Sequence, residues 1–155
     1  MKVTLYNQQR DLPISQHSVK RLISCLSEIL NIESDELVLH FISDSKMKKL
    51  HLDFFNDPSS TDCISFPLCP SDPKRTTFSV LGEVFVCPKV AIAYAIEHAL
   101  DPYEEASRYV IHGILHLLGY DDLEPKEKRK MRAQENRCLK LLSRQGALLK
   151  QLQSL

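Results

Sequence analysis

The sequence has no hydrophobic run that approaches the roughly 20 residues of a membrane-spanning helix. Residues 1–7 turn polar too early to begin a signal peptide. The five cysteines, at positions 25, 63, 69, 87 and 138, are odd in number and contain no Cys-x-x-Cys pair. Such scattered cysteines favour free thiols in a reducing compartment over a disulfide framework. These absences together predict a cytoplasmic protein that does not associate with membranes.

The chain also lacks an excess of either charge, since 20 basic residues balance 20 acidic ones. Overall charge therefore gives no argument for nucleic acid or an anionic membrane, and binding to a polyanion would need a local patch of cations. The 155 residues are 43% apolar and 26% charged, as in ordinary globular proteins, and no linker or repeat divides them. We therefore expect one domain over residues 1–155.

Apolar periodicity and start signals predict alternating strands and helices. Strands are expected at residues 2–6, 36–41, 62–66 and 81–86. Helices are expected after Ser15, after Asp44 or Ser45, and at Pro88, Pro102 and Pro125. This order favours an α/β (or α+β) fold with a small mixed four-stranded sheet covered by about five helices. Residues 69–77 are expected to form a loop, and the tail past Gly146 either to continue as a helix or to fray.

The strongest functional signal is a pair of histidines four residues apart. His112 and His116 share one helix face, which is the spacing of two ligands of one metal ion. Gly119 then ends the helix, and Asp121 and Asp122 follow at once. A chain reversal there would bring one carboxylate back as a third ligand. Three protein ligands with one open position are typical of a catalytic zinc site.

Other interpretations of this segment remain open. In the zinc helix His-Glu-x-x-His the glutamate is the general base, and here Gly113 replaces it, which argues against a metalloprotease or a similar zinc hydrolase. Asp121 equally suits a cap on the next helix, and a carboxylate ligand would widen the choice of divalent ion. No general acid or base is assigned, although Asp121 and Ser65 are the nearest candidates. The other histidines, at positions 17, 40, 51 and 98, lack partners at ligand spacing.

The densest basic run, residues 126–132, follows closely after the histidine pair. Such a run is typical of a solvated helix face, and a phosphate-binding rim would have the same composition. Sequence alone leaves both interpretations open.

Three segments resemble the YbeY family of bacterial rRNA maturation factors. The segment His112-Gly-Ile-Leu-His-Leu-Leu-Gly-Tyr-Asp-Asp122 is similar to the family signature His-Gly-x-Leu-His-Leu-x-Gly-Tyr-Asp-His. Thr61-Asp-Cys-Ile-Ser-Phe-Pro67 resembles Thr-Asp-Val-Leu-Ser-Phe-Pro, and Leu81-Gly-Glu-Val-Phe-Val86 resembles Leu-Gly-Asp-Ile-x-Ile. Order and spacing agree, and the similarity spans roughly residues 36–135.

The resemblance implies a metal-dependent endoribonuclease that acts on single-stranded RNA in 16S rRNA 3′-end maturation and ribosome quality control, with ribosomal small-subunit factors as partners. It also implies one zinc ion per chain. His112 and His116 match two ligands, whereas Asp122 stands where the family has a third histidine. The arginine common in the family before Thr61 is missing from residues 54–57. These departures favour an alternative, namely a ribosome-assembly binding protein with a structural or vestigial metal site.

Overall fold

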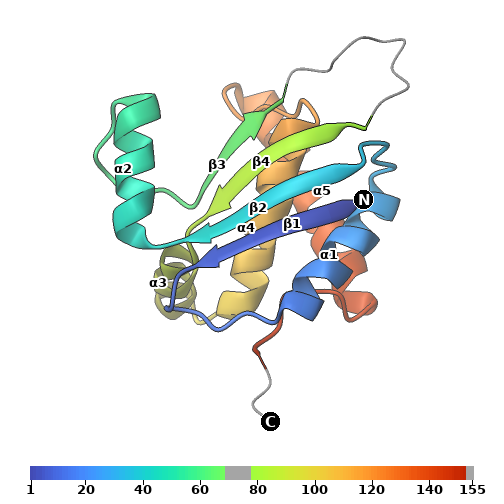
Figure 1. Cartoon of the computed structure of the whole chain (residues 1–155), viewed down its shortest axis with the longest axis horizontal. Coiled ribbons are helices and arrows are strands. Elements are labelled where there is room, and N and C mark those ends of the chain that lie inside the picture. Colours follow the sequence, from blue (N-terminus) through green and yellow to red (C-terminus); the bar gives the residue numbers. More distant parts are fainter. Residues whose placement is uncertain (69–77, 153–155) are drawn as a thin grey trace.

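The computed structural model describes residues 1–68 and 78–152, which form one α/β domain (Figure 1). The nine elements follow the predicted order, and their bounds lie close to the predicted ones. They are β1 (Lys2–Gln8), α1 (Gln16–Ile29), β2 (Glu36–Ile42), α2 (Asp44–Phe55), β3 (Cys63–Pro67), β4 (Val80–Val86), α3 (Pro88–His98), α4 (Pro102–Leu117) and α5 (Pro125–Arg144). The predicted loop at residues 69–77 lies outside the described residues.

The four strands form one mixed sheet in the order β1-β2-β4-β3. β1, β2 and β4 run parallel, while β3 pairs antiparallel with β4 at one edge. In Figure 1, α1, α4 and α5 lie behind the sheet, and α2 stands apart on the left, beyond the β3 edge. The main core lies between the sheet and these helices, where alternate residues of β2 are fully buried: Leu37, Leu39 and Phe41. The predicted fold class is confirmed.

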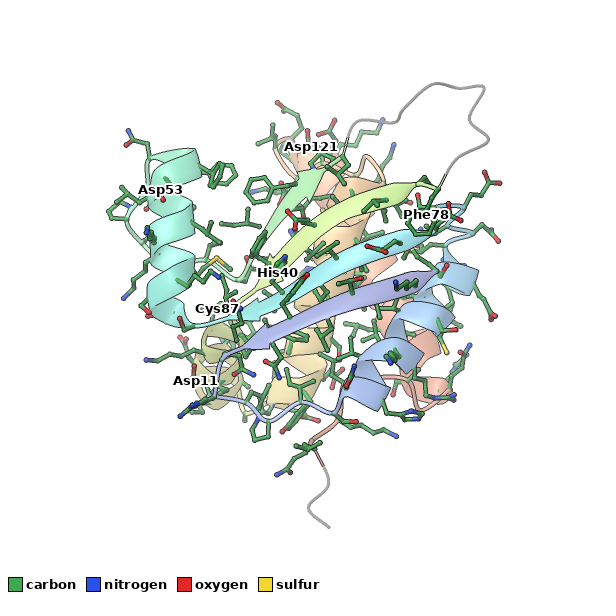
Figure 2. All side chains as sticks on the ribbon, viewed as in Figure 1. Asp11, His40, Asp53, Phe78, Cys87 and Asp121 are labelled. Atoms are coloured by element: carbon green, nitrogen blue, oxygen red, sulfur yellow. The ribbon has the colours of Figure 1, made fainter. Side chains whose placement is uncertain are left out.

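The opposite face of the sheet carries a row of stacked rings. Tyr6, His40 and Phe85 are neighbours on β1, β2 and β4, and their ring centroids lie 5.0 and 4.1 Å apart in that order. Figure 2 shows His40 at the middle of this near face. Cross-strand aromatic pairs of this kind stabilise a sheet.

Gly113 sets how closely α4 approaches the sheet. A Cβ atom at this position would lie 2.5 Å from Val84 Cγ1 and 2.7 Å from Cys63 Sγ, so only glycine fits without movement. The Ser65 hydroxyl also donates a hydrogen bond to the Gly113 carbonyl oxygen, at 2.8 Å. A side chain at 113 would point into the sheet, so a glutamate there could not act as a general base at a neighbouring metal.

Two local expectations are corrected. Helix α2 is capped by Ser43, whose hydroxyl accepts from the Lys46 N–H, because Asp44 already has helical geometry. The tail past Gly146 neither continues α5 nor frays up to Lys150. Gly146 has φ +64° and turns the chain, after which the Leu149 N–H donates to the Ser107 hydroxyl at 2.9 Å. The Lys150 carbonyl accepts from the Ser15 N–H, which joins the tail to the start of α1.

Candidate metal centre

His112, His116 and Asp122 converge at the C-terminal end of α4. The Nε2 atoms of the two histidines lie 3.1 Å apart, and Asp122 Oδ2 lies 3.6 Å from each of them. Asp122 is 40% exposed, so the cluster opens to solvent on its carboxylate side. The neighbouring Asp121 instead uses Oδ1 to accept the Asp122 N–H. The structure thus brings together the three residues selected from the sequence and does not include Asp121 among them.

The helix end explains why Asp122 reaches back. Gly119 has φ +100°, a value that side chains rarely allow, and its N–H bonds to the His116 carbonyl. The Tyr120 N–H bonds to the Leu115 carbonyl, which completes a Schellman motif. This motif reverses the chain within a few residues. The third potential ligand is therefore delivered by the same glycine that ends the helix.

Hydrogen bonds orient both imidazoles. His112 Nδ1 lies 2.8 Å from Glu135 Oε2, and His116 Nδ1 lies 3.1 Å from the Tyr120 carbonyl oxygen. Both partners are acceptors, so each Nδ1 carries the proton and each Nε2 presents a lone pair. Outer hydrogen bonds of this kind are typical of histidines that bind metals.

The three converging atoms fit a divalent cation. Two imidazole lone pairs and a carboxylate oxygen repel one another unless a positive charge lies between them. A triangle with sides of 3.1, 3.6 and 3.6 Å has its equidistant point about 2.0 Å from each corner, which is the Zn–N and Zn–O bond length. The donor set and its spacing therefore suit zinc, although a carboxylate ligand also admits other divalent ions.

Glu135 is a residue of the candidate site that sequence reasoning missed. It lies on α5, is 5% exposed, and also contacts Arg108 Nη1 at 3.2 Å. Burial alone would lower the pKa of His112, but the hydrogen bond and charge of Glu135 outweigh this effect and raise it. Burial would likewise raise the pKa of Glu135, but His112 and Arg108 hold it below its ordinary value. Glu135 is therefore ionised and keeps the His112 Nδ1 proton in place.

Two cavities flank the cluster. The larger one, of about 1010 Å³, is bordered by His112, Asp122 and side chains of α3, α4 and α5. Its rim includes three cations from the basic run: Lys128, Arg129 and Arg132. The smaller one, of about 380 Å³, is bordered by His116 and by residues of α2 and β3. The candidate centre thus lies between two cavities, of which the larger is lined by cations and the smaller, within the described residues, is not.

The whole chain is similar to proteins of one family. The family model described as endoribonuclease YbeY matches residues 4–143. The chain belongs to the YbeY family. An endoribonuclease YbeY of Chlamydia abortus is 41% identical over 153 residues, covering 96% of each chain. One from Protochlamydia amoebophila is 45% identical over 124 residues, covering 78% of this chain and 79% of the relative.

A solved structure agrees with the fold. The solution structure of TM1509 from Thermotoga maritima matches with a TM-score of 0.62 and 26% identity, covering 89% of this chain and 87% of that one. The suspected family resemblance is thus confirmed, and the chain is placed among RNA hydrolases. None of the described helices has the length and apolarity needed to cross a bilayer.

The remaining sequence candidates within this YbeY member have other contacts. The Ser65 hydroxyl is engaged with Gly113 and borders the smaller cavity. His51 Nδ1 bonds to the Ser59 carbonyl, and His98 Nδ1 to the Tyr94 carbonyl. Cys87 and Cys138 are buried in the core, and burial raises the pKa of both thiols. Cys69 lies outside the described residues.

Proposed function

We propose that this chain is a metal-dependent endoribonuclease specific for single-stranded RNA, acting in the cytoplasm in 16S rRNA 3′-end maturation and ribosome quality control. The observation that carries the proposal is the convergence of two oriented Nε2 atoms and one carboxylate oxygen between two cavities, the larger of which has a cationic rim. Membership of the YbeY family supplies the reaction class. Ribosomal small-subunit factors are the partners that this role requires.

His112, His116 and Asp122 are proposed to hold one Zn²⁺ per chain, with other divalent ions as alternatives. Such an ion supplies Lewis acidity toward a phosphate oxygen and a nucleophilic water at neutral pH. Glu135 and the Tyr120 carbonyl orient the two imidazoles, so that the Nε2 lone pairs already point to the proposed ion position before an ion binds. The described residues supply no further side chain that we assign as general acid or base.

The basic run is proposed to bind RNA phosphates. Lys128 and Arg129 border the larger cavity and make no ion pair with the described residues, whereas Arg132 lies 3.6 Å from Glu135. Unpaired cations beside an anion-cleaving centre favour the phosphate-binding interpretation over a merely solvated helix face. The sum of charges is zero, so this local rim is the feature that would attract a polyanion.

The two cavities support the proposed specificity for single strands. We propose that a strand whose scissile phosphate reaches the cluster lies across both hollows, one bordered by α5 and the other by α2. Unpaired RNA can splay its bases into such hollows, whereas an A-form duplex is recognised mainly from its outer surface. The protein is therefore expected to cut a single-stranded oligonucleotide much faster than the same sequence in a duplex.

The test combines metal analysis with cleavage. Native mass spectrometry is expected to show one divalent ion per wild-type chain and none in His116→Ala. Cleavage of single-stranded RNA is expected to stop in His116→Ala and in chelator, and to persist in His17→Ala, which removes an exposed histidine far along the sequence. Cleavage that survives both the chelator and His116→Ala would reveal a contaminant. Metal binding without any cleavage would favour the alternative role as an assembly-binding protein.

A further inference from the structure

We propose that the smaller cavity binds the base of one unpaired nucleotide next to the metal centre, with Phe55 as its stacking wall. The proposal rests on the proposed ribonuclease function and specifies where the substrate is held. The cavity is bordered by Phe55 and His51 of α2, by Ser65 of β3 and by the candidate ligand His116. A base in this hollow would belong to a nucleotide directly beside the scissile phosphate.

The size and chemistry of the cavity suit a nucleobase. Its volume of about 380 Å³ is at the lower end of small-ligand sites, below the volume of the neighbouring cavity. Among the described residues that border it there is no lysine, arginine, aspartate or glutamate. The hydroxyl groups of Thr61 and Ser65 donate their protons to Asp62 and to the Gly113 carbonyl, so their oxygens can accept hydrogen bonds from a base edge. Phosphate is therefore disfavoured here and favoured at the cationic rim on the other side of the cluster.

Phe55 is exposed in a way that the fold does not require. It is 56% exposed and contacts His51, whose ring is tilted at a centroid distance of 5.8 Å. Its neighbour Phe54 is 61% exposed but packs edge-on against Phe66, at 4.9 Å, and does not border the cavity. Exposed aromatic rings in a nucleic-acid channel act as platforms on which bases stack.

The end of α2 holds this wall in position. Asn56 adopts a left-handed conformation with φ +56°, and its N–H bonds to the Leu52 carbonyl. Asp57 Oδ1 accepts from both the N–H and the hydroxyl of Ser59. The Ser59 carbonyl in turn accepts from His51 Nδ1 at 2.7 Å. Because the His51 ring and the backbone that carries Phe55 are held before substrate arrives, stacking costs less ordering entropy.

Phe55→Ala and Phe54→Ala form a matched pair, since both remove a largely exposed phenyl group from adjacent positions of one helix. Loss of a stacking platform is expected to raise KM for single-stranded RNA at least fivefold in Phe55→Ala, whereas Phe54→Ala stays within twofold of wild type. Phe55→Trp is expected to restore the wild-type KM. Circular dichroism checks that all three variants keep the fold. The oligonucleotides carry one abasic residue at successive positions around the cut site.

The abasic series separates stacking from a structural effect. At one position beside the cut, the abasic residue is expected to weaken binding to wild type and to have no added effect in Phe55→Ala. Equal effects of Phe54→Ala and Phe55→Ala, or an undiminished abasic effect in Phe55→Ala, would overturn the proposal. If wild type cuts no RNA, the proposed function fails by itself. NMR titration with adenosine and uridine monophosphates then still tests the cavity, through shifts of the Phe55 and His51 resonances that disappear in Phe55→Ala, and their absence would overturn the base site.

Discussion

Glu135→Gln is the sharpest test of how the metal centre is organised. The variant keeps the size of a side chain that is 5% exposed, so the core around α5 should stay packed. It removes the charge that faces His112 Nδ1 at 2.8 Å and Arg108 Nη1 at 3.2 Å. An amide oxygen turned toward His112 leaves its NH₂ group facing the guanidinium, so one of the two contacts becomes donor against donor.

The expected loss follows from these contacts. Replacing the acceptor behind a metal-binding histidine lowers metal affinity by about 10- to 100-fold, which corresponds to about 1.4–2.7 kcal/mol. The metal-free protein should also lose roughly 1.5–3 kcal/mol of unfolding free energy, because the lost hydrogen bonds are buried and charge-assisted. Zinc affinity is measured by competition with a chromophoric chelator, and stability by urea denaturation in EDTA.

Glu105→Gln is the matched control. Glu105 is 7% exposed on α4 and lies 3.6 Å from Arg108, but it makes no hydrogen bond to a histidine within the described part of the chain. It should alter stability without changing zinc affinity by more than about twofold. The reasoning is refuted if folded Glu135→Gln binds zinc as tightly as wild type, or if both variants lose affinity equally.

Three further substitutions address the candidate ligand Asp122, the glycine that sets α4 close to the sheet and the glycine that reverses the chain after α4. Asp122→His should raise zinc affinity in the same competition assay, because imidazole is the softer ligand; an unchanged value would mean that this position does not touch the ion. Gly113→Ala should lower the urea midpoint by an amount equivalent to roughly 1–3 kcal/mol, because its Cβ would meet Val84 Cγ1 at 2.5 Å; a more stable protein would show that α4 can shift freely. Gly119→Ala has open space for its Cβ, so about 1–2 kcal/mol of backbone strain is the whole expected cost. Its zinc affinity should fall as well if the chain reversal positions Asp122, and calorimetric titration would detect that fall.

Local patterns were sufficient to predict most of the fold. The proline start signals at Pro88, Pro102 and Pro125 each mark the first residue of a helix, because proline at that position loses no hydrogen bond. The i, i+4 spacing likewise predicted that His112 and His116 would face one point. The choice between Asp121 and Asp122 was not accessible from spacing alone, because it depends on the Schellman turn at Gly119.

The position of Glu135 in the sequence is unusual, but its meaning becomes clear only from the structure. It falls on the apolar stripe of α5 formed by Met131, Cys138 and Leu142, where a carboxylate needs a partner. The identity of that partner depends on tertiary packing, since α4 and α5 must lie side by side before His112 can reach Glu135. The smaller cavity is equally nonlocal, because it exists only where the end of α2 meets β3 and His116.

Both departures from the family pattern reduce the positive charge at the site. With Asp122 in place of the third histidine of the family signature, the proposed ligands would carry one negative charge, so a bound divalent ion would retain about half of its positive charge for the substrate. Residues 54–57 supply no cation on the α2 side, and Phe55 borders the hollow there instead. The positive charge available to RNA is therefore concentrated on the α5 side, at Lys128, Arg129 and Arg132. In the proposed function, a strand that crosses this centre would have its backbone attracted on the α5 side and one base held on the α2 side.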